Sequence, residues 1–108
     1  MASIAASERF IARSRDEAAA AVRAIVETQA ALKQDVERAA EVGRKLFPPA
    51  QAQLIVDLIR RDLPYYDATI SREFVAGMND FARSMGILDG SVPYEDVVAT
   101  QFSCLWKE

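Results

Sequence analysis

Apolar residues recur every three or four positions along most of this chain, and that spacing favours helices over strands. The clearest case is residues 70–86, where one side of a helix carries Phe74, Val75, Met78, Phe81, Ala82 and Met85. Ser71 is a candidate N-cap, with Ile70 and Val75 placed to form a hydrophobic staple. No segment alternates with the period of two that a half-buried strand needs. The pattern therefore predicts an all-α fold.

The same segment ends in turn signals that begin another helix. Gly86 stands where a left-handed C-cap is expected, and Ile87 can fold back onto the last turn. Asp89-Gly90 turns the chain. We expect a last helix to begin near Pro93 and to carry Tyr94, Val97, Val98, Phe102, Leu105 and Trp106.

A long helix is predicted over residues 15–34. Ser14 and Glu17 have the spacing of a capping box. The apolar stripe of this helix contains Ala18, Val22, Ile25, Val26, Leu32 and Val36. An apolar lead-in before it suggests a short helix and contains Ile4, Phe10 and Ile11.

Two more helices are predicted between residues 35 and 64. Asp35 can cap the first of them, and Gly43 within its apolar stripe indicates a close backbone approach. Phe47-Pro48-Pro49 ends that helix, because a residue before proline avoids the helical region, and Pro49 suits the first turn of the next. Leu54, Ile55, Leu58 and Ile59 form the apolar face of the next helix, which Pro64 closes. Residues 1–108 thus read as one helical domain with about five amphipathic helices joined by short loops.

Composition excludes several classes of function. The chain has 108 residues, a net charge of -3 and no histidine, so the commonest general base and metal ligand is missing. Mixed charge of both signs argues against nucleic-acid binding, and the apolar runs are too short to insert into a membrane. Cys104 is the one cysteine, which rules out a disulfide framework and predicts a buried or half-buried side chain. We expect no cofactor, no metal and no catalysis.

Few residues stand out as candidates for binding. Tyr65 and Tyr66 lie side by side in a predicted loop at 65–69, where they could stack on a ligand or anchor the loop to the core. Arg60-Arg61 could bind a phosphate, but fits better as the basic end of a helix, with Asp57 four residues before Arg61.

Other features have equally plain structural explanations. Glu95 and Asp96 suit the first turn of a helix, where negative charge is stabilised by the dipole. The aromatic and methionine stripe of residues 74–85 is more typical of core packing than of an apolar ligand pocket. Trp106 either clamps onto the helices or belongs to an interface.

The order of these signals resembles the C-terminal end of the periplasmic solute-binding proteins of ABC transporters, in the group for nitrate, sulfonates, taurine and thiamine precursors. Four segments carry the resemblance: Ala5-Ala-Ser-Glu-Arg-Phe-Ile-Ala, Leu46-Phe-Pro-Pro, Leu63-Pro-Tyr-Tyr-Asp and the run from Phe74 to Val98. It extends from about Ala5 to Trp106 and corresponds to the last third of a family member. Val36 departs from the family, which often has proline after the residue matching Asp35.

The resemblance implies a non-enzymatic, detached helical part of an α/β lobe that closes on a small anionic or heterocyclic solute. It implies a periplasmic location, whereas the start of the sequence shows no signal peptide and by itself indicates the cytoplasm. The helices over residues 15–34 and 71–86 would have apolar faces made for a sheet, so we expect them to pack on each other or on a second copy, as a homodimer. The alternative is an autonomous helical module that binds another protein.

Overall fold

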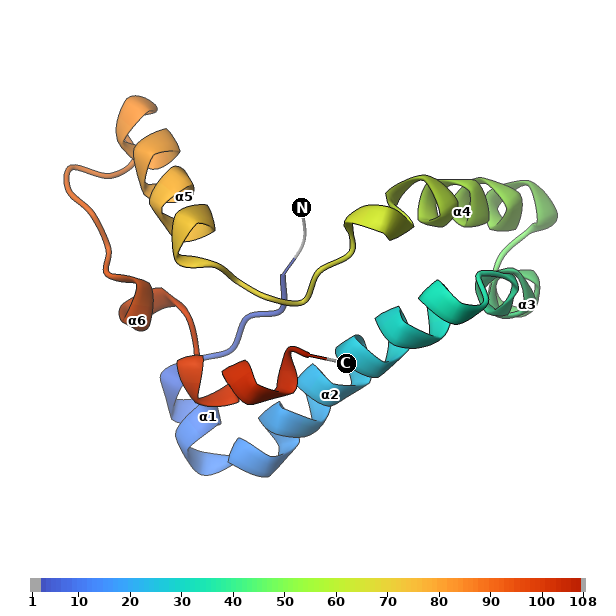
Figure 1. Cartoon of the computed structure of the whole chain (residues 1–108), viewed down its shortest axis with the longest axis horizontal. Coiled ribbons are helices and arrows are strands. Elements are labelled where there is room, and N and C mark those ends of the chain that lie inside the picture. Colours follow the sequence, from blue (N-terminus) through green and yellow to red (C-terminus); the bar gives the residue numbers. More distant parts are fainter. Residues whose placement is uncertain (1–2, 108) are drawn as a thin grey trace.

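The computed structural model describes residues 3–107, which are largely helical and contain no β-strand. The elements in chain order are α1 (Glu8–Arg13), α2 (Arg15–Gln34), α3 (Glu37–Leu46), α4 (Pro49–Asp62), the 3₁₀-helix η1 (Leu63–Tyr65), α5 (Arg72–Ser84), α6 (Tyr94–Val97) and the 3₁₀-helix η2 (Thr100–Leu105). The all-α fold class is confirmed. Figure 1 shows α2 as the long central element, with the α3–α4 hairpin at its far end.

Helix α2 has the predicted bounds, but its predicted capping box does not form. Ser14 also ends α1, and its backbone N–H donates to the Phe10 carbonyl oxygen at 2.7 Å. Its ψ of 49° differs from the extended value of an N-cap, and its hydroxyl makes no capping hydrogen bond to α2. One residue cannot serve both helix ends here. The short helix predicted ahead of α2 is confirmed as α1.

Helices α3 and α4 form a tight hairpin. The Asp35 carboxylate accepts a hydrogen bond from the Glu37 backbone N–H at 3.0 Å, which confirms it as a capping residue. A Cβ placed on Gly43 would lie 3.4 Å from the Ala52 Cβ, so the predicted close approach is also confirmed. Pro49 occupies the first turn of α4 as expected.

Helix α5 has the predicted caps at both ends. The Ser71 hydroxyl accepts from the Phe74 backbone N–H at 3.0 Å. Gly86 has a φ of 72°, and the N–H groups of Gly86 and Ile87 donate to the carbonyls of Arg83 and Ala82, which is a Schellman motif. Ile87 itself stays exposed, so the expected fold-back of its side chain buries little.

The predicted single last helix is wrong, because the chain is broken between α6 and η2. Val98 is extended, with φ −112° and ψ 127°, and the Thr100 N–H bonds back to the Val98 carbonyl at 2.8 Å. The β-branched residues Val97, Val98 and Thr100 favour this break, since they lose side-chain freedom in a helix. The break lets Val98 and Phe102 become buried, and η2 lies alongside α2.

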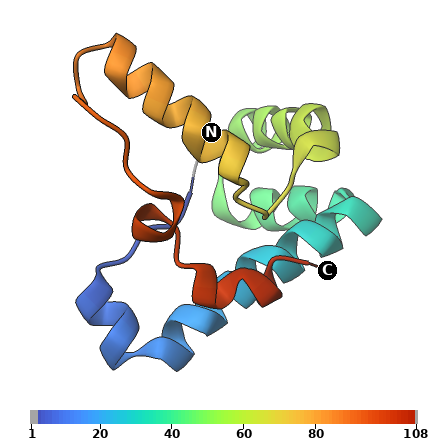
Figure 2. The ribbon, with the colours of Figure 1, turned by 60° about the vertical axis from the view of Figure 1, so that its left-hand side comes forward.

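The buried core is small and lies in two places. One part, at α2 and the C-terminal segment, consists of Ala18, Val26, Val98 and Phe102; the other, in the α3–α4 hairpin, consists of Ala40, Ala52 and Val56. The radius of gyration is 16.7 Å, whereas a compact domain of this length has about 13 Å. The chain is therefore an open arrangement of helices, and α5 stands away from α2 in both views (Figures 1 and 2).

Candidate functional site

One candidate surface is the apolar side of α5, whose large side chains stay exposed. Four side chains at positions i, i+4, i+7 and i+11 form it, and we call them the α5 ridge: Phe74, Met78, Phe81 and Met85, with exposed fractions of 40, 52, 57 and 61%. Helix α5 has no buried residue. The prediction that this stripe packs in the core is therefore wrong for the single chain. An exposed row of large apolar side chains marks a surface that binds something.

Polar contacts hold the conformation around α5 without burying the ridge. The Asn79 side-chain amide donates to the Val92 carbonyl at 3.0 Å and accepts from the Val92 N–H at 3.1 Å. Arg83 donates to the Gly90 carbonyl at 3.3 Å and to the Ser91 hydroxyl, and it pairs with Asp80. The returning loop is thus fastened to one flank of α5.

A second set of contacts joins the start of α5 to α6. Arg72 lies over the ring of Tyr94, 4.5 Å from its centroid, and pairs with Glu95. The hydrogen bond from Arg72, together with a backbone hydrogen bond, lowers the pKa of the Glu95 carboxyl below its ordinary value. The Tyr94 hydroxyl donates to the Ile70 carbonyl at 2.5 Å. Residues 70–98, which we call the α5–α6 lobe, are therefore tied together internally by polar bonds. The predicted place of Glu95 and Asp96 in a first helical turn is confirmed.

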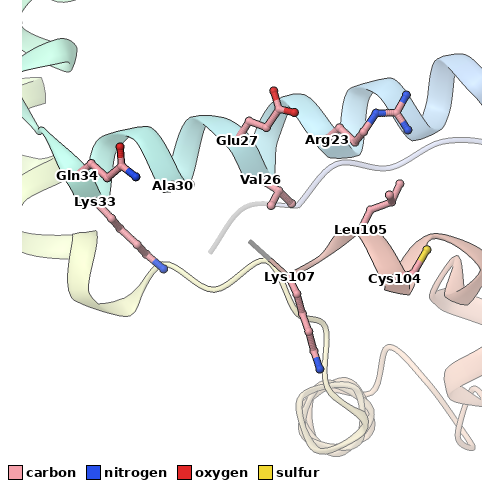
Figure 3. A pocket seen from close by; sticks show the side chains of 9 residues that line it. All are labelled: Arg23, Val26, Glu27, Ala30, Lys33, Gln34, Cys104, Leu105 and Lys107. Carbon is pink, nitrogen blue, oxygen red and sulfur yellow. The ribbon is translucent and has the colours of Figure 1, made fainter.

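A shallow groove of about 620 Å³ lies between α2 and the C-terminal segment. The α2–η2 groove is lined by Arg23, Val26, Glu27, Ala30, Lys33 and Gln34 of α2, and by Cys104, Leu105 and Lys107. Figure 3 shows Val26 on the α2 wall and Leu105 on the wall formed by the C-terminal segment. The groove has an apolar floor and a basic rim, since its lining holds three cationic side chains and one carboxylate.

The two tyrosines proposed from sequence lie apart from this groove. Tyr65 ends η1 and is 83% exposed, and Tyr66 follows it half-buried. Neither belongs to the groove lining. Their role as ligand contacts therefore stays a prediction.

The two arginines at the end of α4 pair with acidic neighbours. Arg60 pairs with Glu37 of α3, which adds a link across the hairpin. Arg61 pairs with Asp62 at 2.8 Å, whereas Asp57 accepts from Gln53 at 2.9 Å, so the expected Asp57–Arg61 pair is wrong. The hydrogen bond from Arg61 lowers the pKa of Asp62. Both arginines lie in the last turn of α4, as expected.

Cys104 is exposed, so the prediction of a buried or half-buried thiol is wrong. Cys104 lies two residues after Phe102 in η2, and Phe102 is the buried one of the two. Trp106 is half-buried. Sequence reasoning missed the groove, since its two walls are separated by about seventy positions and no local pattern joins them.

Two further classes of site can be reported for residues 3–107. Within that range, no group of three or more histidine, cysteine, aspartate or glutamate side chains could hold a metal ion. Across the same stretch, no helix has the length and apolar character needed to span a membrane.

Comparison with protein families, with curated proteins and with solved structures finds no match to this chain. Neither the resemblance to solute-binding proteins nor any solute is tested by these comparisons. The physical features on which a function can be argued are therefore the α5 ridge and the α2–η2 groove.

Proposed function

We propose that this chain is the helical C-terminal portion of a periplasmic solute-binding protein of an ABC transporter, for a small anionic or heterocyclic solute. It contributes to binding and catalyses no reaction. In the whole protein, its helices cover a surface that residues 1–108 do not themselves supply. The proposal places that whole protein in the periplasm.

The observation that carries this proposal is the exposure of the α5 ridge. Four large apolar side chains in a row would be a liability on a chain that works alone in water. They are what a helix needs when it lies against another layer of the same fold. The open shape of the chain, with its two small and separate core regions, supports the same interpretation.

Local structure at the segments that carry the resemblance also supports it. Phe47 is extended before Pro48. The Schellman turn at Gly86 follows α5, and Asn79 holds the returning loop at Val92. These local contacts fix the conformation of the loops between helices, and they leave the α5 ridge exposed. A connection that is fixed in this way is suited to presenting a helix face to a neighbouring layer.

The same proposal predicts two properties of the isolated chain. It binds no solute by itself, because the rest of the binding cleft lies in the other parts of the protein. It also self-associates as a homodimer, since the α5 ridge is covered by a second copy when the natural neighbour is missing.

A chimaera tests the proposed function. The corresponding last third of a sulfonate-binding or nitrate-binding protein is replaced by residues 5–106, and solute binding is measured by calorimetry. We expect a folded chimaera that binds the solute of its parent. A matched chimaera carrying Phe81→Glu should fold poorly or bind weakly, because a charge would then lie between two layers. A chimaera that folds and binds equally well with Phe81→Glu would contradict the role given to the ridge.

The alternative is an autonomous helical module that binds another protein, and the α5 ridge is equally the observation that favours it. The two functions differ in the genomic sequence before Met1. An open frame encoding strands and a signal sequence supports the solute-binding protein, whereas a ribosome-binding site directly upstream supports the module. A thermal-shift panel of sulfonates, nitrate and pyrimidines on the isolated chain should show no shift in either case.

A further inference from the structure

We infer that the α5 ridge of one copy docks in the α2–η2 groove of a second copy, and that the second copy returns the same contact. This assigns specific surfaces to the self-association proposed above, and it rests on that proposal. The product is a closed, two-fold symmetric homodimer with two identical contacts.

The two surfaces have matching lengths. The ridge runs over twelve residues, from Phe74 to Met85, which is about 16 Å along a helix axis. The α2 wall of the groove also runs over twelve residues, from Arg23 to Gln34. Val26, Ala30 and Leu105 give the groove an apolar floor. A row of Phe and Met side chains can therefore lie along the whole of it.

Their charges are complementary. The α5–α6 lobe has two basic residues, Arg72 and Arg83, and both pair with carboxylates of the same lobe. Its acidic residues outnumber them, and they are Glu73, Asp80, Asp89, Glu95 and Asp96. Glu73 is exposed in the first turn of α5, next to Phe74. The groove has the opposite charge, with Arg23, Lys33 and Lys107 against Glu27. Opposite charge around an apolar centre selects this pairing over two α5 ridges packed face to face.

The area of contact points the same way. A large aromatic side chain buries about 150–250 Å², so four half-exposed ridge side chains offer about 400 Å². Two ridges packed on each other would bury about 800 Å² in total, which is the size of a weak lattice contact. Two ridge-in-groove contacts would cover both ridges and both grooves, so they would bury more surface than one contact between two ridges.

Variants on the two surfaces test the inference by sedimentation across the micromolar range. Met78→Glu alters the ridge and Ala30→Glu alters the groove. We expect each to weaken dimerisation by about thirtyfold or more, the usual cost of losing a hot-spot contact. The matched controls are Ala76→Glu and Ala24→Glu, which place the same charge at exposed positions on the same two helices, outside the ridge and the groove lining. Both controls should dimerise like the unaltered chain.

Mixing the two variants gives a sharper result. In a dimer of one Met78→Glu chain and one Ala30→Glu chain, one of the two contacts has both surfaces unaltered. We therefore expect the mixture to associate more tightly than either variant alone. Failure of the mixture to regain affinity overturns the reciprocal pairing, and so does a groove variant that dimerises normally while the ridge variant does not.

Cross-linking identifies the partners directly, because Cys104 is the chain's one cysteine and lines the groove. Oxidised Met78→Cys should give a covalent dimer whose peptide map joins residue 78 of one copy to residue 104 of the other. Ala76→Cys should give far less of that product. Links between two residues 78, or a 78–104 link within one chain of monomer mass, would overturn the inference.

The mass in solution tests this inference together with the self-association predicted above, whereas the chimaera tests solute binding separately. An unaltered chain that stays monomeric, or whose mass keeps growing with concentration, overturns the reciprocal dimer. Neither result affects the solute binding of the chimaera, which tests the proposed function on its own.

Discussion

The α3–α4 hairpin and the α5–α6 lobe achieve a fixed shape in opposite ways. The hairpin packs small residues closely, with Gly43 against Ala52, and buries Val56 to 3% exposure. The lobe has hydrogen bonds and ion pairs at Asn79, Arg83 and Arg72 but buries no residue of α5. The hairpin buries part of its apolar surface within the chain, although Val42, Leu46 and Leu54 stay exposed. No residue of α5 is buried, so the lobe is shaped within the chain and left to be covered from outside.

This difference teaches that order and burial are separate properties. Exposed ion pairs contribute little to stability, because water screens them and long side chains lose entropy. They can nevertheless select one conformation of a loop. The lobe is therefore expected to tolerate loss of apolar groups that the buried regions cannot lose.

The largest effect is expected from truncating the same side chain in the two kinds of environment. Phe102 is 5% exposed and Phe81 is 57% exposed. Phe102→Ala should lower the free energy of unfolding by about 3–5 kcal/mol, since it leaves a cavity. Phe81→Ala should cost less than about 1 kcal/mol in the dilute monomer. Urea unfolding at low protein concentration measures both, and equal losses would contradict the contrast.

A smaller effect is expected from enlarging Gly43. A leucine there would force the hairpin apart, because the nearest Ala52 carbon lies in contact with any added Cβ at 3.4 Å. Overpacking of this kind costs about 1–3 kcal/mol. The melting temperature of Gly43→Leu should fall, while that of Gly43→Ala should change far less. A stable Gly43→Leu variant would mean that α3 and α4 are not held close.

Removing the amide of Asn79 should loosen the lobe alone. Asn79→Ala loses two hydrogen bonds to Val92, each worth about 0.5–1.5 kcal/mol. Hydrogen exchange at the Val92 N–H should become faster, whereas exchange at Val56 in the hairpin should not change. Equal acceleration at both sites would show that the lobe and the hairpin unfold as one unit.

Replacing Gly77 is expected to stabilise the lobe, in contrast to the preceding substitutions. This residue lies inside α5, and a Cβ added there meets nothing within 4 Å. Gly77→Ala should therefore raise stability by about 0.5–1 kcal/mol, because alanine loses less backbone entropy in a helix. Helical content and the melting temperature check this, and a drop in either would indicate a contact at Gly77 that the single chain does not have.

The smallest effect concerns pH. The pKa of Glu95 is lowered in the folded lobe by Arg72, so this pair contributes to folding above the ordinary glutamate pKa of about 4.3. The contribution is lost as the pH falls through the lower, folded value. An NMR titration should place the Glu95 inflection below its ordinary value, and Arg72→Gln should move it back up. An inflection that Arg72→Gln leaves unchanged would contradict the assignment of Arg72 as the cause.

Local signals in the sequence predicted local structure well. The predicted helix caps and prolines begin or end helices at the expected positions, because such residues depend on only a few neighbours. They are Ser71, Gly86, Asp35 and the Pro48-Pro49 pair. Ser14 is the exception. Its capping role failed because α1 ends on the same residue, and that competition could not be seen in the Ser14–Glu17 spacing.

Predictions that depended on distant parts of the chain fared worse. The stripe of α5 indicated a core face, but whether anything covers Phe81 or Met78 depends on where the helix is placed. Likewise, the burial of Phe102 depends on contact between η2 and α2. The α2–η2 groove joins residues from both ends of the chain, so periodicity along the sequence could not reveal it.

The central claim is that the α5 ridge is open in the single chain and is covered by a partner. Oxidative footprinting of Met78 and Met85 over a range of protein concentrations tests it most directly. We predict that both methionines react as exposed residues in dilute solution and become protected as copies associate. Protection of both at every concentration, in a chain of monomer mass, would contradict the claim, because the ridge would then be buried within the chain itself.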